Sequence, residues 1–229
     1  MNKLDFSSRQ ALDEALAHTV AGILRGAIAR WGKASLVVSG GSTPVNFFRV
    51  LSAASLDWSR VTILLADERW VPPEHQDSNE RLVRENLLVG AAANAHFVPL
   101  KTPHVSASEA ELEVAATLAG IGRFDLVILG MGSDGHTASL FPGTDNLAEG
   151  LDLNSTKPCL AVEPSTAPYQ RMTLTLARLL DSERIFVHIT GREKQYVLDQ
   201  ARKAVDPFQL PIAAILCQQK TPVTVFFAE

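Results

Sequence analysis

The sequence is poor in cysteine and in long apolar runs. Its two cysteines, Cys159 and Cys217, lie far apart and belong to no CxxC motif, so we expect neither a disulfide framework nor a structural zinc site. No window approaches the roughly 18 continuous apolar residues that a membrane span needs. The N-terminal stretch MNKLDFSSRQALDEAL has no apolar signal segment. These absences predict a cytoplasmic protein with no membrane partner.

An excess of positive charge is also missing. The chain has 21 Lys and Arg against 25 Asp and Glu, a formal net charge of −4, which excludes the basic footprint typical of nucleic-acid binding. With 229 residues, 46% of them hydrophobic, it can bury a full core in one unit. We therefore expect a single domain over residues 1–229, a monomer, and a small-molecule partner.

Apolar runs that suit buried strands alternate with helical patterns. The runs lie at 35–39, 61–66, 96–100, 124–130, 171–176, 184–190 and 223–228. The helical patterns lie at 8–31, 45–53, 78–88, 106–120 and 192–201. Strands that are apolar at every position are covered on both faces. The alternation predicts a doubly wound, Rossmann-like α/β fold with a mostly parallel sheet and helices on both faces.

One stretch interrupts this alternation. Residues 156–170 contain three prolines, and we predict a surface connection there.

A glycine-rich loop, SGGSTP, follows the strand predicted at 35–39. Thr43 is a good N-cap residue, and Pro44 suits a first helical position. Free N–H groups at a helix start, with nearby hydroxyls, form an anion-binding cradle. The cradle residues would be Ser39, Gly40, Gly41, Ser42 and Thr43. No Lys follows the glycines, so this is not a nucleotide-binding P-loop; the alternative is a tight turn without a ligand.

A second glycine-rich loop, GMGSDGHT, follows the run FDLVIL. Asp134 and His136 flank Gly135, so a bend there would let both side chains reach the same crevice. Histidine is largely neutral at pH 7 and can act as a general base, and a nearby carboxylate can fix its tautomer. The alternative is a histidine that only binds a loop carbonyl.

A third polar segment, ADERWVPPEHQDSN, follows the strand predicted at 61–66. Asp67, Glu68 and Arg69 would lie at its carboxyl end, and a helix would begin near Asn79 after the loop 70–78. Arg69 could clamp a phosphate or carboxylate, since guanidinium groups bind such anions bidentately. Alternatively, the three residues form a solvated turn with an internal ion pair.

The motifs SGGSTP, DERWVP with DSN, and LGMGSDGHTASLFPG, in this order, resemble the 6-phosphogluconolactonase family. The later PYQRMTLT and TGREK also fit, so the resemblance covers nearly the whole chain. It implies hydrolysis of 6-phospho-D-glucono-1,5-lactone in the oxidative pentose phosphate pathway, without a cofactor or an obligatory metal. It assigns the general base to His136. Phosphate binding would fall to the 39–43 loop with Arg69 and Arg171, and less strongly to Lys194.

The resemblance leaves the supporting carboxylates open. Asp134 would orient His136 or the sugar hydroxyls, with Asp67 or Glu68 as further candidates. Ser39, Ser42 and Ser133 lack a G-x-S-x-G context, which disfavours an acyl-enzyme route.

Related proteins offer other functions. Glucosamine-6-phosphate deaminase has a similar D-G-H loop, but its Glu before the Pro-Gly dipeptide is replaced here by Phe141, and Arg69 stands where it has a Tyr. The same motifs would also suit a lactonase of different specificity or a non-catalytic sugar-phosphate sensing domain.

Overall fold

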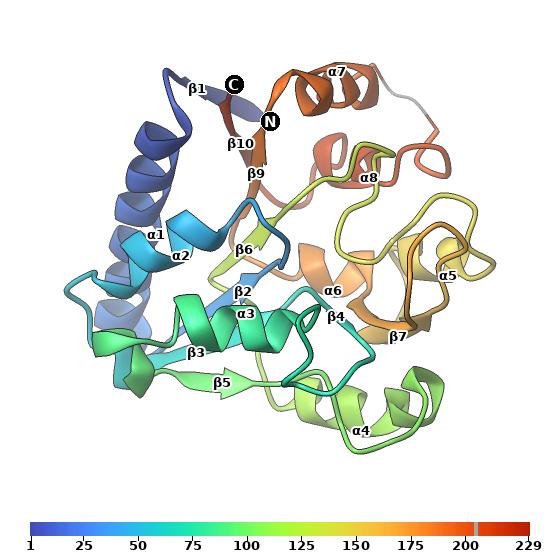
Figure 1. Cartoon of the computed structure of the whole chain (residues 1–229), viewed down its shortest axis with the longest axis horizontal. Helices are drawn as coiled ribbons and strands as arrows, with labels where there is room; N and C mark the ends of the chain where they lie inside the picture. Colours follow the sequence, from blue (N-terminus) through green and yellow to red (C-terminus); the bar gives the residue numbers. More distant parts are fainter. Residues whose placement is uncertain (204–205) are drawn as a thin grey trace.

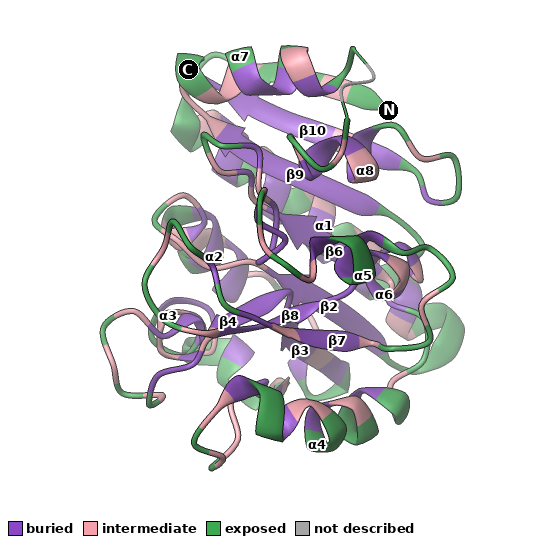
Figure 2. Ribbon diagram, turned by 90° about the vertical axis from the view of Figure 1, so that its right-hand side faces the viewer, coloured by how far each residue is buried: buried purple, intermediate pink, exposed green. Residues whose placement is uncertain are grey.

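The computed structural model describes residues 1–203 and 206–229. Within them, seven strands form one parallel sheet in the order β1-β10-β9-β6-β2-β3-β5 (Figure 1). These strands are β1 (Asn2–Phe6), β2 (Ala34–Val38), β3 (Val61–Leu65), β5 (His96–Val98), β6 (Leu126–Leu129), β9 (Ile185–Thr190) and β10 (Val223–Ala228). Figure 2 shows the central strands buried. The prediction of a doubly wound α/β fold with a largely parallel sheet is confirmed.

Helices cover both faces of this sheet, with α1 and α2 on one side and α6 and α8 on the other (Figure 1). The helices are α1 (Arg9–Trp31), α2 (Val45–Ser52), α3 (Asn79–Asn86), α4 (Ala107–Ala119), α5 (Leu147–Leu151), α6 (Leu176–Leu180), α7 (Arg192–Ala201) and α8 (Ile212–Leu216), with 3-10 turns at Trp58–Arg60 and Gly90–Asn94. Ser8 caps α1, and Ser106 with Glu109 forms a capping box on α4. None of the described helices is long and apolar enough to cross a membrane.

The strand order reverses between β2 and β6, and this reversal positions the site. The chain runs from β2 outward to β3 and β5, then returns to β6 on the other side of β2 and continues to β9 and β10. Val38 and Ile128 are register partners in β2 and β6, so the two glycine-rich loops begin side by side. The Ser39 hydroxyl donates to the carbonyl of Ile128 at 3.2 Å. A ligand crevice is expected at such a switch point.

A second, three-stranded antiparallel sheet was not predicted. It has the order β4-β8-β7, formed by β4 (Asp67–Arg69), β8 (Arg171–Leu174) and β7 (Cys159–Val162). The run at 171–176 therefore does not join the parallel sheet. The prediction of a surface connection at 156–170 was also wrong in part, because the prolines flank β7 without interrupting it and Cys159, Leu160 and Val162 are buried.

The edge strand β1 was also missed. Three of its five residues are exposed, and such a polar segment carries no apolar run. Its strand conformation follows from pairing with β10, which its own sequence does not predict.

The start of α2 differs from the prediction. The helix begins at Val45, Pro44 occupies the N-cap position, and no side chain caps the helix. Thr43 therefore does not act as the cap. Pro44 already has helical backbone angles, and its carbonyl accepts from the Phe48 N–H at 2.8 Å. With no capping side chain, the first N–H groups of α2 stay available to a ligand.

Candidate active site

A cavity of about 240 Å³ lies at the carboxyl ends of β2 and β6. Nine of the predicted site residues line it: Ser39, Gly40, Gly41, Ser42, Thr43, Asp67, Arg69, His136 and Lys194. Asp134 and Arg171 lie outside this lining, but Asp134 is hydrogen-bonded to His136 and Arg171 is the strand partner of Arg69, and both of these partners line it. The tertiary structure thus brings together four segments, at residues 39–43, 67–69, 136 and 194, that are separated by up to about 155 residues in the chain.

His136 and Asp134 form a close pair at the cavity. The His136 Nδ1 lies 2.6 Å from Asp134 Oδ1, which also accepts from the His136 backbone N–H at 3.1 Å. Burial acts to raise the pKa of Asp134, but the hydrogen bonds and charge of His136 outweigh it and leave that pKa below its usual value. In the neutral tautomer with its proton on Nδ1, His136 donates to the ionised carboxylate, and its Nε2 is a free proton acceptor.

Gly132 makes room for this pair. A Cβ at residue 132 would lie 2.2 Å from His136 Nδ1 and 2.4 Å from Asp134 Oδ1, distances that real side chains do not adopt. Gly135 has a φ of +79°, a left-handed conformation that glycine adopts without strain. These glycines explain why Asp134 and His136 can converge.

The glycine-rich loop at 39–43 is held against β4 and α3 by a similar close approach. A Cβ on Gly40 would lie 1.8 Å from Asn79 Oδ1. The Asn79 side-chain amide donates to the carbonyl of Asp67 at 2.9 Å. The loop at 39–43 and the DER segment are therefore positioned by the same buried asparagine.

The two carboxylates of the DER segment have different environments. Asp67 lines the cavity and accepts from the Ser139 hydroxyl at 2.6 Å. Glu68 is fully buried and accepts from the backbone N–H groups of Asn79 and Glu80 at 2.8 and 2.7 Å, which stabilises the start of α3. Burial raises the pKa of Glu68 to about 7 against these hydrogen bonds. Glu68 therefore supports a helix and does not orient His136.

Arg69 and Arg171 lie opposite each other on β4 and β8. An Nη of Arg69 donates to the Asp77 carbonyl at 2.5 Å, and an Nη of Arg171 donates to the Pro168 carbonyl at 3.0 Å. Both Nε atoms are buried and have no hydrogen-bond partner among the residues that the structure describes. Burial and then the charge of Arg69 lower the pKa of Arg171. Two adjacent cations, Arg171 buried and Arg69 half-buried, with free donors favour an anion between or beside them.

Lys194 reaches the cavity from the first turn of α7. Its ammonium donates to the carbonyl of Met131, in the second glycine-rich loop. Burial lowers the pKa of this amine. Lys194 therefore adds a cation to the wall of the cavity that His136 also lines.

The family model described as glucosamine-6-phosphate isomerases/6-phosphogluconolactonase matches residues 7–225. The chain belongs to this family. A 6-phosphogluconolactonase of Rhizobium meliloti (strain 1021) is 46% identical over 224 residues, 97% of each chain. The crystal structure of a 6-phosphogluconolactonase from Shewanella baltica OS155 is 45% identical, with a TM-score of 0.98 over 100% of this chain and 98% of that one. A monomeric glucosamine-6-phosphate deaminase, 16% identical with a TM-score of 0.80 over 98% and 97% of the two chains, shares the fold alone.

Because isomerases and lactonases share this family, Phe141 is informative. Its ring lies 4.3 Å from the His136 ring, measured between centroids, with an interplanar angle of 32°, and it is buried. The Arg171 guanidinium lies 6.0 Å from the same Phe141 centroid. The apolar Phe141 ring therefore packs against the His136 imidazole. Phe141 occupies the sequence position, before the Pro-Gly dipeptide, at which the deaminases are expected to have a Glu.

His188 is a member of the site that sequence reasoning missed. It lines the same cavity, although it lies in the middle of the buried strand β9. The one signal in the sequence was a single ionisable residue inside the apolar run RIFVHIT. Nothing in that run indicates that the imidazole reaches the cavity, which depends on the packing of α1 and α2 against β9.

Two further features of the described residues bear on other kinds of site. No group of three or more His, Cys, Asp and Glu side chains in residues 1–203 and 206–229 could hold a metal ion. A larger hollow of about 1020 Å³ adjoins α5 and α8 and includes Leu153 and Phe208, but no predicted site residue lines it. The chemistry-bearing side chains are at the switch point.

Proposed function

We propose that this protein hydrolyses 6-phospho-D-glucono-1,5-lactone to 6-phosphogluconate in the oxidative pentose phosphate pathway, with His136 as the general base. The observation that carries the proposal is the His136–Asp134 pair, 2.6 Å apart, at a cavity that also includes the 39–43 loop and Arg69. The lactonases from Rhizobium meliloti and Shewanella baltica support the substrate class.

The base acts through a defined tautomer. Asp134 accepts the Nδ1 proton, so Nε2 of His136 takes a proton from water as the water oxygen bonds to C1 of the lactone. The imidazolium that forms is stabilised by the Asp134 carboxylate. When the bond from C1 to the ring oxygen breaks, the imidazolium returns the proton to that oxygen. No covalent enzyme intermediate is needed.

The cationic and N–H donors bind the charges of the substrate. The uncapped start of α2 and the hydroxyls of the 39–43 loop form the phosphate cradle, with Lys194 and the Arg69–Arg171 pair as cations. Backbone N–H groups of the second glycine-rich loop stabilise the oxyanion at C1. Asp67, held by Ser139, accepts a hydrogen bond from a sugar hydroxyl.

The test is hydrolysis of freshly generated 6-phosphogluconolactone, with product detected by a coupled assay for 6-phosphogluconate. The wild type should exceed the spontaneous rate, and His136→Ala should lower kcat by about 10²- to 10⁴-fold while product affinity changes little. A wild-type rate equal to spontaneous opening would refute the function, and an unchanged kcat in the variant would refute the role of His136. Turnover of glucosamine 6-phosphate in place of the lactone would identify an isomerase.

A further inference from the structure

His188 and Asp13 form a buried pair below the phosphate cradle. The Nε2 atom of His188 lies 3.3 Å from Asp13 Oδ1, and the two side chains are 3% and 7% exposed. The Phe47 ring also packs against the imidazole in an edge-to-face arrangement, with centroids 5.9 Å apart and an interplanar angle of 79°. The imidazole is thus held from two sides, by α1 and by α2.

Asp13 connects His188 to the start of α2. Its other oxygen, Oδ2, accepts from the Asn46 side-chain amide at 2.8 Å. Asn46 is the second residue of α2 and follows the 39–43 loop by three residues. The Asp13 carboxylate therefore joins the helix start that forms the cradle to the imidazole on β9.

In the free protein the hydrogen bonding of this pair is incomplete. A buried carboxylate needs a charged or hydrogen-bonding partner. Asp13 has the Asn46 amide on Oδ2 and faces His188 Nε2 with Oδ1. Both ring nitrogens, Nδ1 and Nε2, are buried and have no hydrogen-bond partner among the described residues, so the 3.3 Å approach of Nε2 to Asp13 is an ion-pair contact without hydrogen-bond geometry. Because His188 lines the cavity, a ligand in the cavity can provide a hydrogen-bond partner.

We propose that His188 is a further binding residue for the substrate phosphate, kept in the imidazolium form by Asp13 when the phosphate is bound. Nε2–H then lies in ion-pair contact with Asp13, and Nδ1–H donates to a phosphate oxygen. The inference rests on the proposed function, since it requires a phosphate at the 39–43 loop. The other ionisable groups that share the cavity are Asp67, Arg69, His136 and Lys194, and Asp13 is the one that faces His188 from α1.

Calorimetric titration with 6-phosphogluconate and with gluconate separates this role from packing. His188→Gln and Asp13→Asn should each weaken binding of 6-phosphogluconate about tenfold to a hundredfold, as expected for the loss of a charged hydrogen bond. Binding of gluconate should change less than about twofold, and KM for the phosphorylated lactone should rise more than kcat falls.

Phe47→Leu is the matched control, because it disturbs the packing around the same ring without removing a charge. It should preserve the ratio of the two affinities. If His188→Gln weakens binding of 6-phosphogluconate and of gluconate equally, so that the ratio of the two affinities is unchanged, the assignment is overturned. A wild type that binds both ligands equally would refute the phosphate site of the proposed function and His188 with it.

A second measurement needs no variant. With the wild type saturated by inorganic phosphate, the ¹⁵N chemical shifts of the His188 ring should show protons on both nitrogens. A neutral tautomer in the phosphate-saturated protein would overturn the proposal even if His188→Gln fails to fold.

Discussion

Arg69 and Arg171 are directly opposed on neighbouring antiparallel strands, with both Nε atoms buried and unpartnered among the described residues. In the ligand-free protein the like charges repel each other, and an anion would relieve that repulsion. The pair thus costs folding free energy and favours anion binding.

Replacing Arg171 should separate these two effects. Arg171→Met removes one charge and keeps most of the apolar stem, so the free energy of unfolding without ligand should not fall by more than about 1 kcal/mol. The kcat/KM for the phosphorylated lactone should fall about tenfold to a hundredfold relative to the unphosphorylated lactone. Chemical denaturation and the two rate measurements test this, and an equal loss on both substrates would contradict a phosphate role.

The requirement for glycine at residue 132 is testable with a matched control. Gly132→Ala would push its Cβ into the His136–Asp134 pair, so kcat should fall at least about a hundredfold while the protein remains folded by circular dichroism. Gly122→Ala, ten residues earlier and outside the cavity lining, is the control, since a Cβ there meets no described atom within 4 Å. If both variants retain wild-type kcat, the close pair is unnecessary for catalysis.

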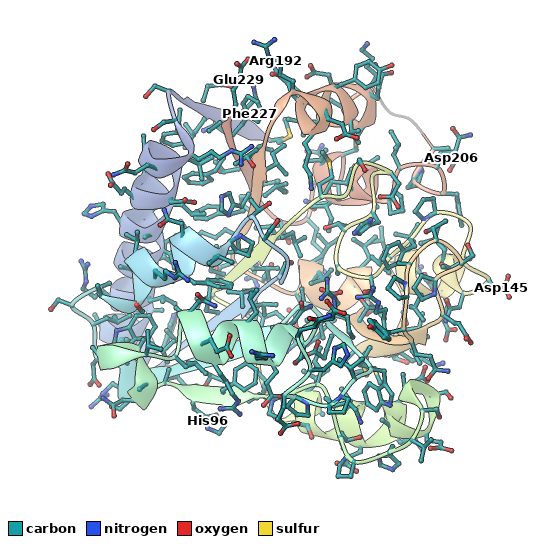
Figure 3. All side chains as sticks on the ribbon, viewed as in Figure 1. His96, Asp145, Arg192, Asp206, Phe227 and Glu229 are labelled. Atoms are coloured by element: carbon teal, nitrogen blue, oxygen red, sulfur yellow. The ribbon has the colours of Figure 1, made fainter. Side chains whose placement is uncertain are left out.

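Lys194 and Arg192 offer a second matched comparison. Both lie in the first turn of α7, but Lys194 lines the cavity, whereas Arg192 is exposed and pairs at 3.2 Å with Glu229 near the C-terminus (Figure 3). Lys194→Met should raise KM for the phosphorylated lactone about tenfold or more. Arg192→Met should leave KM unchanged, because exposed ion pairs contribute little. Equal KM values in the two variants would remove Lys194 from the phosphate site.

Glu68 should give folding a characteristic pH dependence. Its pKa of about 7 in the folded protein lies above the usual value of 4.5, so between these pH values the folded state holds a proton that the unfolded chain has released. The contribution of Glu68 to the free energy of unfolding is therefore largest below pH 4.5 and decreases as pH rises through about 7, by up to about 3 kcal/mol.

Urea denaturation of the wild type and Glu68→Gln between pH 4.5 and 8 measures this contribution, since Gln does not titrate. As pH rises, the free energy of unfolding of the wild type should fall relative to that of Glu68→Gln. Parallel pH profiles for the two proteins would show that Glu68 does not titrate in this range.

Local patterns were sufficient to predict much of the parallel sheet and the two glycine-rich loops. A buried parallel strand is recognised as a short apolar run. The His136–Asp134 pair and the two glycines that make room for it, Gly132 and Gly135, lie within five residues of sequence. Because the carboxyl ends of parallel strands share one edge of a sheet, the sequence alone places residues 39–43 and 130–137 at the same edge.

Contacts between polar residues that are distant in the sequence were determined only by the tertiary structure. Glu68 supports α3 because the N–H groups of Asn79 and Glu80 surround it, which the letters DER do not indicate. The opposition of Arg69 to Arg171 depends on the pairing of β4 with β8, across about 100 residues. Asp13 and His188 meet only because α1 packs over β9. Apolar periodicity determines which segments become strands and helices, whereas the partner of each buried polar group is determined by packing between them.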